Sequence, residues 1–125
     1  MNPTNPDLVR FLLDRIAEDR LAAIGSAPGP WSVVDDRGPD GIAHCLYFQG
    51  GYYISETLIN RPTAEHIARH HPIRIIAECD AKRRIVQECL ALGEEVYNAS
   101  SADVILAALA LPYADHPGYR PEWRS

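Results

Sequence analysis

The sequence predicts an α+β fold, in which a small antiparallel sheet is accompanied by helices. Apolar residues recur at helical spacing before residue 25 and after residue 63, whereas residues 31–55 alternate with period two and are rich in β-formers. Clusters of proline and glycine separate these segments. The 125 residues, 46% of them hydrophobic, suffice for one core, so residues 1–125 are expected to form a single domain.

Residues 1–25 are predicted to form an amphipathic helix. Asn5 is a suitable N-cap, Pro6 fits the first turn, and Gly25 marks the end. The face expected to be buried carries the apolar residues Leu8, Leu12, Ile16 and Ala23.

Residues 31–55 are predicted to form a three-stranded antiparallel β-meander with strands at 31–34, 42–49 and 52–55. The glycine pair at 50–51 supplies the positive φ angles of a tight hairpin turn between the second and third strands. The turn-rich residues 35–41 separate the first and second strands.

Residues 63–93 are predicted to form a kinked helix pair. Thr63 is expected to cap a short helix over 64–70, and Pro72 to open a longer one that reaches Leu92 and ends at Gly93. On the longer helix, Ile75, Cys79, Val86 and Leu90 share one face, with Ile76 and Cys89 at its margins.

Residues 100–125 are predicted to form a buried helix followed by a docked aromatic tail. Ser100 or Ser101 is the expected cap, and the helix is apolar nearly all round, so we expect it to be covered by the domain or by a second subunit. Two tyrosines and a tryptophan stand among three prolines after Leu111, which predicts that the tail packs back onto the domain.

Two motifs resemble a known family. Residues 109–123 contain LALPYADHP followed by Tyr119-Arg120 and Glu122-Trp123, and residues 66–84 contain HIARH, Pro72 and AKRR. Both are similar to an actinobacterial and actinophage family classed as a domain of unknown function, from which the chain departs at His71, where relatives usually have aspartate. A weaker similarity, carried by residues 28–31 (PGPW), is to the Ead-like small phage proteins. The resemblance implies no activity, cofactor or catalytic residue.

Composition excludes several classes of protein. The three cysteines, Cys45, Cys79 and Cys89, lack CxxC spacing, which argues against a disulfide framework or zinc ribbon and favours a reducing, cytoplasmic location. No apolar run approaches the length of a membrane span. A net charge of −5 argues against nucleic-acid binding, although Lys82, Arg83 and Arg84, with Arg69 and Arg74, offer a basic stripe. Glu78 and other acids interrupt that stripe, and Glu78 is placed to pair with Lys82.

His66 and His70 are the candidate metal ligands. Their i, i+4 spacing allows two imidazoles to reach one divalent ion, with His71, Glu65 or Cys79 as a third ligand. The segment lacks the glutamate of HExxH, and two histidines at this spacing also occur on ordinary exposed helix faces.

The tail offers a second set of candidates. Asp115 and His116, with Tyr113 nearby, contain groups used in acid–base catalysis by small hydrolases or transferases, yet a structural clasp explains them as well. No P-loop, GxGxxG, GxSxG or EF-hand motif is present, so no residue is assigned as catalytic. The function expected from the sequence is therefore a non-enzymatic interaction module that binds a protein partner or forms a homodimer. The interaction residues expected in its tail are Tyr113, Asp115, His116, Tyr119, Arg120 and Trp123.

Overall fold

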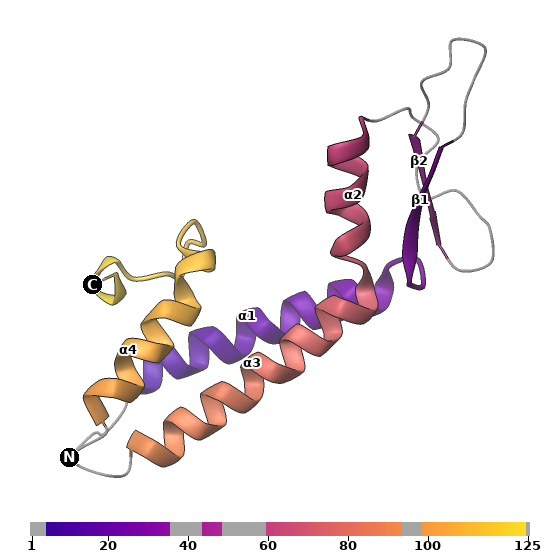
Figure 1. Ribbon diagram of the computed structural model, residues 1–125. Coiled ribbons are helices and arrows are strands. Elements are labelled where there is room, and N and C mark those ends of the chain that lie inside the picture. The colour runs from indigo at the N-terminus through magenta and orange to yellow at the C-terminus, as the bar shows by residue number, and fades with distance from the viewer. Residues whose placement is uncertain (1–4, 36–43, 49–59, 94–98, 125) are drawn as a thin grey trace. The chain divides into compact units, whose positions relative to one another are not determined.

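The computed structural model describes residues 5–35, 44–48, 60–93 and 99–124, and these residues are mostly helical (Figure 1). In chain order the elements are α1 (Pro6–Gly25), β1 (Trp31–Asp35), β2 (His44–Phe48), α2 (Arg61–Arg69), α3 (Pro72–Gly93), α4 (Ala99–Ala110) and two 3₁₀ turns, η1 (Leu111–Tyr113) and η2 (Pro121–Trp123). The predicted helices over 6–25 and 72–93 are confirmed, with the predicted first residues Pro6 and Pro72.

The predicted α+β fold with a three-stranded meander is wrong. Two paired five-residue strands, β1 and β2, make up the β structure of the described chain, against helices of 20 and 22 residues. The predicted third strand, at 52–55, falls outside the described residues. A two-stranded ribbon cannot form a layer by itself and needs a helix to cover it. Within the described residues, the alternation of this region corresponds to a short two-stranded hairpin.

The chain divides into two compact units, one made of residues 1–19 and 79–125 and the other of residues 20–78. The expectation of a single domain stays a prediction. We call these the terminal unit and the hairpin unit and describe each by itself.

The terminal unit has a core of small and branched side chains. In α1 the predicted buried face is confirmed for Leu8, Leu12 and Ile16, and in α3 for Cys79 and Val86. Burial of these side chains is the main favourable contribution to folding of the unit. Its buried residues are Leu8, Val9, Phe11, Leu12, Ile16, Cys79, Val86, Cys89, Ala102, Leu106, Ala110 and Trp123.

Helix α4 buries only one of its faces. Ala102, Leu106 and Ala110 are fully buried, whereas Val104 is 67% exposed, Ile105 39% and Leu111, which follows the helix, 48%. Burial of this whole helix by its own chain is therefore wrong, whereas cover of its exposed side by a second subunit stays a prediction. Ser100 and Ser101 lie inside the helix, which begins at Ala99, so neither is its cap.

The hairpin unit packs β1 and β2 against α2. The strands pair antiparallel, with Trp31 opposite Phe48 and Val33 opposite Leu46. Ala64 and Ala68 are the buried residues of α2, and Trp31 and Val33 pack on them. Alanines at i, i+4 let the strand approach the helix closely, which explains why this short ribbon is held there.

The start of α2 differs from the prediction. Asn60, not Thr63, is the N-cap: its side chain accepts a hydrogen bond of 2.9 Å from the backbone N–H of Thr63. The helix therefore begins at Arg61, three residues earlier than expected. His70 closes α2 and His71 precedes Pro72, so the predicted break between the two helices is present.

Candidate functional site

The C-terminal tail lies against α1 of the terminal unit, and Phe11 is the centre of that contact. Its ring centroid lies 6.3 Å from Tyr113, 5.5 Å from His116, 6.0 Å from Tyr119 and 5.1 Å from Trp123. The first three pairs are edge-on, the arrangement that aromatic quadrupoles favour. Trp123 is only 5% exposed. We call Phe11 and these four side chains the clasp.

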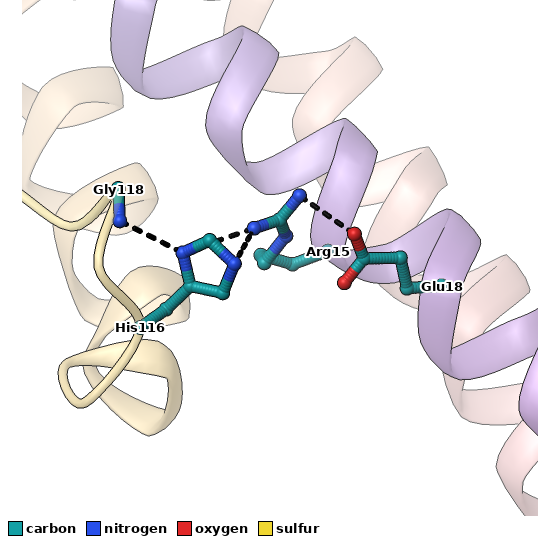
Figure 2. Close-up of polar contacts among 4 residues, drawn as sticks. All are labelled: Arg15, Glu18, His116 and Gly118. Carbon is teal, nitrogen blue, oxygen red and sulfur yellow. Dashed lines mark hydrogen bonds and ion pairs between the residues drawn. The ribbon is translucent and has the colours of Figure 1, made fainter.

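Polar contacts fix the geometry of the clasp (Figure 2). The Arg15 guanidinium lies against both ring nitrogens of His116, and it donates a hydrogen bond to Glu18 over 2.8 Å. The backbone N–H of Gly118 donates to His116 Nδ1 over 2.9 Å. The imidazole of His116 is thereby held between α1 and the turn that contains Gly118. Both of its nitrogens are in contact with donor groups.

Two further contacts connect α1 to the tail. The Tyr113 hydroxyl donates to Asp19 Oδ2 over 2.7 Å, and Arg120 Nη1 donates to Asp7 Oδ2 over 3.0 Å. Burial, followed by the hydrogen bond to Asp19, raises the pKa of Tyr113 well above its ordinary value of 10.0. The phenol is therefore held as a neutral donor, which suits a structural role and not that of an acid or base near neutral pH.

Three buried polar atoms of this region have no hydrogen-bond partner among the residues that the structure describes: Arg15 Nε, Tyr119 OH and Trp123 Nε1. A buried unsatisfied donor costs about 1–3 kcal/mol. The clasp is therefore less stable than the apolar area that it buries suggests.

The predicted acid–base candidates are not arranged as a catalytic dyad. Asp115 is exposed, while His116 contacts Arg15 and Gly118, and Tyr113 donates to Asp19. A general base needs an acceptor atom that is within reach of a substrate proton and is not already used by another donor. The groups that the sequence suggested are instead bound to other residues of the protein, as are His116 and Tyr113, or exposed to solvent, as is Asp115.

An open pocket of about 180 Å³ lies beside the clasp, where the start of α1, α4 and η2 meet. Its apolar walls are Leu8, Val104, Ala107 and Trp123. Asn5, Asp103 and Glu122 supply its polar lining. We call it the α4 pocket. A concave site with apolar walls and a few polar groups is the usual form of a binding site.

His66 and His70 lie next to each other on α2, with ring centroids 4.5 Å apart. His70 Nδ1 lies 2.7 Å from the His66 carbonyl oxygen, which leaves its Nε2 for a ligand. Glu65 is paired with Arg61 over 2.9 Å. In the described ranges no three His, Cys, Asp or Glu side chains are grouped to hold a metal ion. The pair offers two ligands of the three or four that a tight site requires, and metal binding there stays a prediction.

The basic stripe on α3 is interrupted, as the sequence indicates. Glu78 pairs with Arg74 over 2.9 Å, so the predicted partner Lys82 is not the one it contacts. Arg83 and Arg84 are exposed. The role of this stripe stays a prediction.

The cysteines of α3 are core residues. Cys79 and Cys89 are both buried. Burial, with smaller effects from Asp103 and Glu88, raises the pKa of the Cys89 thiol. A raised pKa disfavours the reactive thiolate, so Cys89 is not an activated nucleophile.

The comparison with protein families identifies the class of this chain. Residues 5–125 match a family of unknown function (DUF6221), so the chain belongs to that family. No curated protein and no solved structure shows a significant match. The resemblance to a domain of unknown function is thus confirmed, whereas the actinobacterial or phage origin and the Ead-like similarity stay predictions. None of the described helices combines the length and apolarity needed to cross a bilayer.

Sequence reasoning found the tail side of the clasp but missed its partners on α1. Phe11 is the one aromatic residue among the buried positions of that helix, and this was the available signal. Asp7, Arg15 and Asp19 of α1 each contact a tail residue about 100 positions away, and helical periodicity alone does not predict such contacts. The α4 pocket had no sequence signal, because its residues come from three separate segments.

Proposed function

We propose that this protein is a small, non-enzymatic interaction module that binds a protein partner through the outward side of α4. That side consists of Val104, Ile105 and Leu111 and is called the α4 face below. The exposure of these three large apolar side chains is the observation that carries the proposal. Neighbouring exposed apolar residues beside a pocket are typical of protein contact surfaces.

The clasp acts in this proposal as the support of the α4 face. Trp123 is buried against Phe11 and lines the α4 pocket, so the docked tail completes one wall of the binding surface. Tyr113, His116 and Tyr119 contact α1 and hold the tail, while Asp115 and Arg120 remain exposed beside the turn. The engagement of the tail's acid–base groups within the protein favours binding over catalysis.

The partner is expected to be basic and different from this chain. Asp103 and Glu122 lie beside the α4 face, and the whole chain carries a net charge of −5. A second copy would bring the same carboxylates to the contact, and like charges at an interface are unfavourable. A basic segment with apolar side chains complements both the charge and the exposed residues.

Site-specific photo-crosslinking tests the proposal. A photoreactive phenylalanine analogue replaces Val104 in the full chain, and a control places it at Arg83, which is exposed on α3. The protein cross-linked from position 104 is then purified and its affinity measured against the unlabelled chain. We expect Val104→Asp to weaken binding about tenfold or more, since it places a charge in the apolar contact, and Arg83→Ala to leave binding unchanged. Equal binding by Val104→Asp would refute the proposal, as would adducts formed only with a second copy.

A further inference from the structure

We infer that the α4 pocket binds an arginine side chain of the partner, an inference that rests on the proposed function and names the group recognised. The pocket opens next to the α4 face, since Val104 belongs to both. A residue inserted there would anchor the partner at the edge of its apolar contact. Arginine is among the residues most enriched at such anchor positions.

The carboxylates of the pocket are available to a cation. One oxygen of Asp103 accepts the backbone N–H of Asn5 over 3.2 Å, and this is its single hydrogen bond within the described residues. Glu122 forms no hydrogen bond or ion pair with any described residue. Among the described residues that line the pocket, these two are the charged ones and none is basic. A guanidinium fits such a pair, because it donates to two acceptors at once.

The walls of the pocket suit the rest of an arginine side chain. Leu8 and Ala107 provide apolar surface for the methylene stem, and Trp123 provides an aromatic wall. The volume of about 180 Å³ exceeds that of an engineered cavity of about 150 Å³ that accommodates benzene. Guanidinium groups stack on aromatic rings better than ammonium groups do. The Arg120 guanidinium already lies 5.6 Å from the Trp123 ring centroid, so this ring is compatible with such a contact.

The start of α1 does not turn the pocket into an anion site. Helix N-termini favour anions because their first N–H groups lack partners. Here the backbone N–H groups of Asp7 and Leu8 both donate to the Asn5 side chain, over 3.1 and 3.2 Å. The helix end is therefore capped, and the remaining charges of the pocket are negative.

Nuclear magnetic resonance titration of the isotopically labelled full chain tests the inference. The probe is Nα-acetyl-arginine N-methylamide, and the neutral norleucine analogue and the acetyl-glutamate analogue serve as comparisons. We expect saturable shifts at the Trp123 indole N–H and at the Asp103, Val104 and Ala107 amides with the arginine probe. Because Asp103→Asn keeps an acceptor for the Asn5 N–H, the double variant Asp103→Asn, Glu122→Gln should fold and bind the probe about tenfold more weakly.

A control with the same change in net charge distinguishes binding of the arginine probe in the pocket from general electrostatic attraction to the protein. The double variant Asp14→Asn, Asp115→Asn removes two exposed carboxylates elsewhere on the terminal unit and should bind the arginine probe like the wild type. Equal shifts with norleucine, stronger shifts with glutamate, or equal loss in both double variants would each overturn the inference. None of these results would bear on the proposed function, which is tested separately by the Val104→Asp variant and by the identity of the photo-crosslinked adducts.

Discussion

At the scale of single residues, Phe11 explains why the tail is ordered. One aromatic side chain of α1 contacts four rings of the tail, and the Arg15 guanidinium lies 5.3 Å from its ring centroid. A proline-containing segment that buries aromatic rings on a rigid helix recovers the entropy lost in ordering it. Phe11 is therefore the side chain that these four tail rings have in common as a contact.

Replacement of Phe11 should therefore destabilise the terminal unit strongly. We expect Phe11→Ala to lower the free energy of unfolding by about 3–5 kcal/mol, the usual effect of removing a buried aromatic ring. Leu21→Ala, at a site that is 68% exposed, should change it by less than about 0.5 kcal/mol. Urea denaturation measures both values. A Phe11→Ala loss as small as that of the control would contradict the description of the clasp.

Tyr113 should make the protein sensitive to alkali. Its pKa is raised in the folded state, so its stabilising effect is complete below the unfolded value of 10.0 and decreases as the pH rises above that value. We expect stability to fall above pH 10, and to fall less steeply in Tyr113→Phe. That variant should also lose about 1 kcal/mol near neutral pH, where the hydrogen bond to Asp19 is intact in the wild type.

The check is the urea midpoint of both proteins measured from pH 8 to pH 11. Parallel curves for the wild type and Tyr113→Phe would show that another group controls the alkaline loss.

At the scale of elements, periodicity and the terminal prolines and glycine predicted the two long helices well, whereas the caps of α2 and α4 and the three-stranded sheet were predicted wrongly. Pro6, Pro72 and Gly93 identify helix ends locally, because a proline or glycine acts on its own backbone. Period-two alternation indicates extended chain but does not fix how many strands pair, since pairing depends on contacts distant in sequence. The exposed side of α4 could not be predicted either, because an apolar helix can be buried by its own chain or by a partner.

The capping residue of α2 gives a test that distinguishes the structure from the sequence-based prediction. Asn60→Ala should destabilise the hairpin unit by about 1 kcal/mol, because its side chain satisfies the N–H of Thr63. Thr63→Ala should have little effect, since Thr63 is exposed in the first turn. Thermal unfolding followed by circular dichroism compares the two variants. A larger effect at Thr63 than at Asn60 would place the start of this helix where the sequence suggested.

At the scale of the whole molecule, the cysteines of α3 report on the integrity of the terminal unit. Cys89 is buried at 1% exposure and its pKa is raised, so it should react slowly with a thiol reagent at pH 8. In a Cys45→Ser background, Phe11→Ala should accelerate labelling by loosening the unit, since local opening governs access to buried groups. Mass spectrometry of the labelled peptide measures the rate. Rapid labelling of Cys89 in the otherwise unaltered background would contradict the described core.

The molecule as a whole combines two surfaces of different kinds. The inner side of the tail is covered by α1, whereas the α4 face is covered by nothing in the described chain. The aromatic residues of the sequence indicated the docked tail, and its apolar last helix indicated the α4 face. The sequence did not signal the pocket between them, whose carboxylates and apolar walls come together only on folding. The central claim is that a different, basic protein covers the α4 face.

Native mass spectrometry of the untagged full chain, measured beside Val104→Asp, tests that claim most directly. We predict a monomer for both proteins over the accessible concentration range, because the acidic α4 pocket disfavours a second copy at the α4 face. A wild-type dimer that Val104→Asp converts to monomer would show that a second copy covers this face, and would contradict the account.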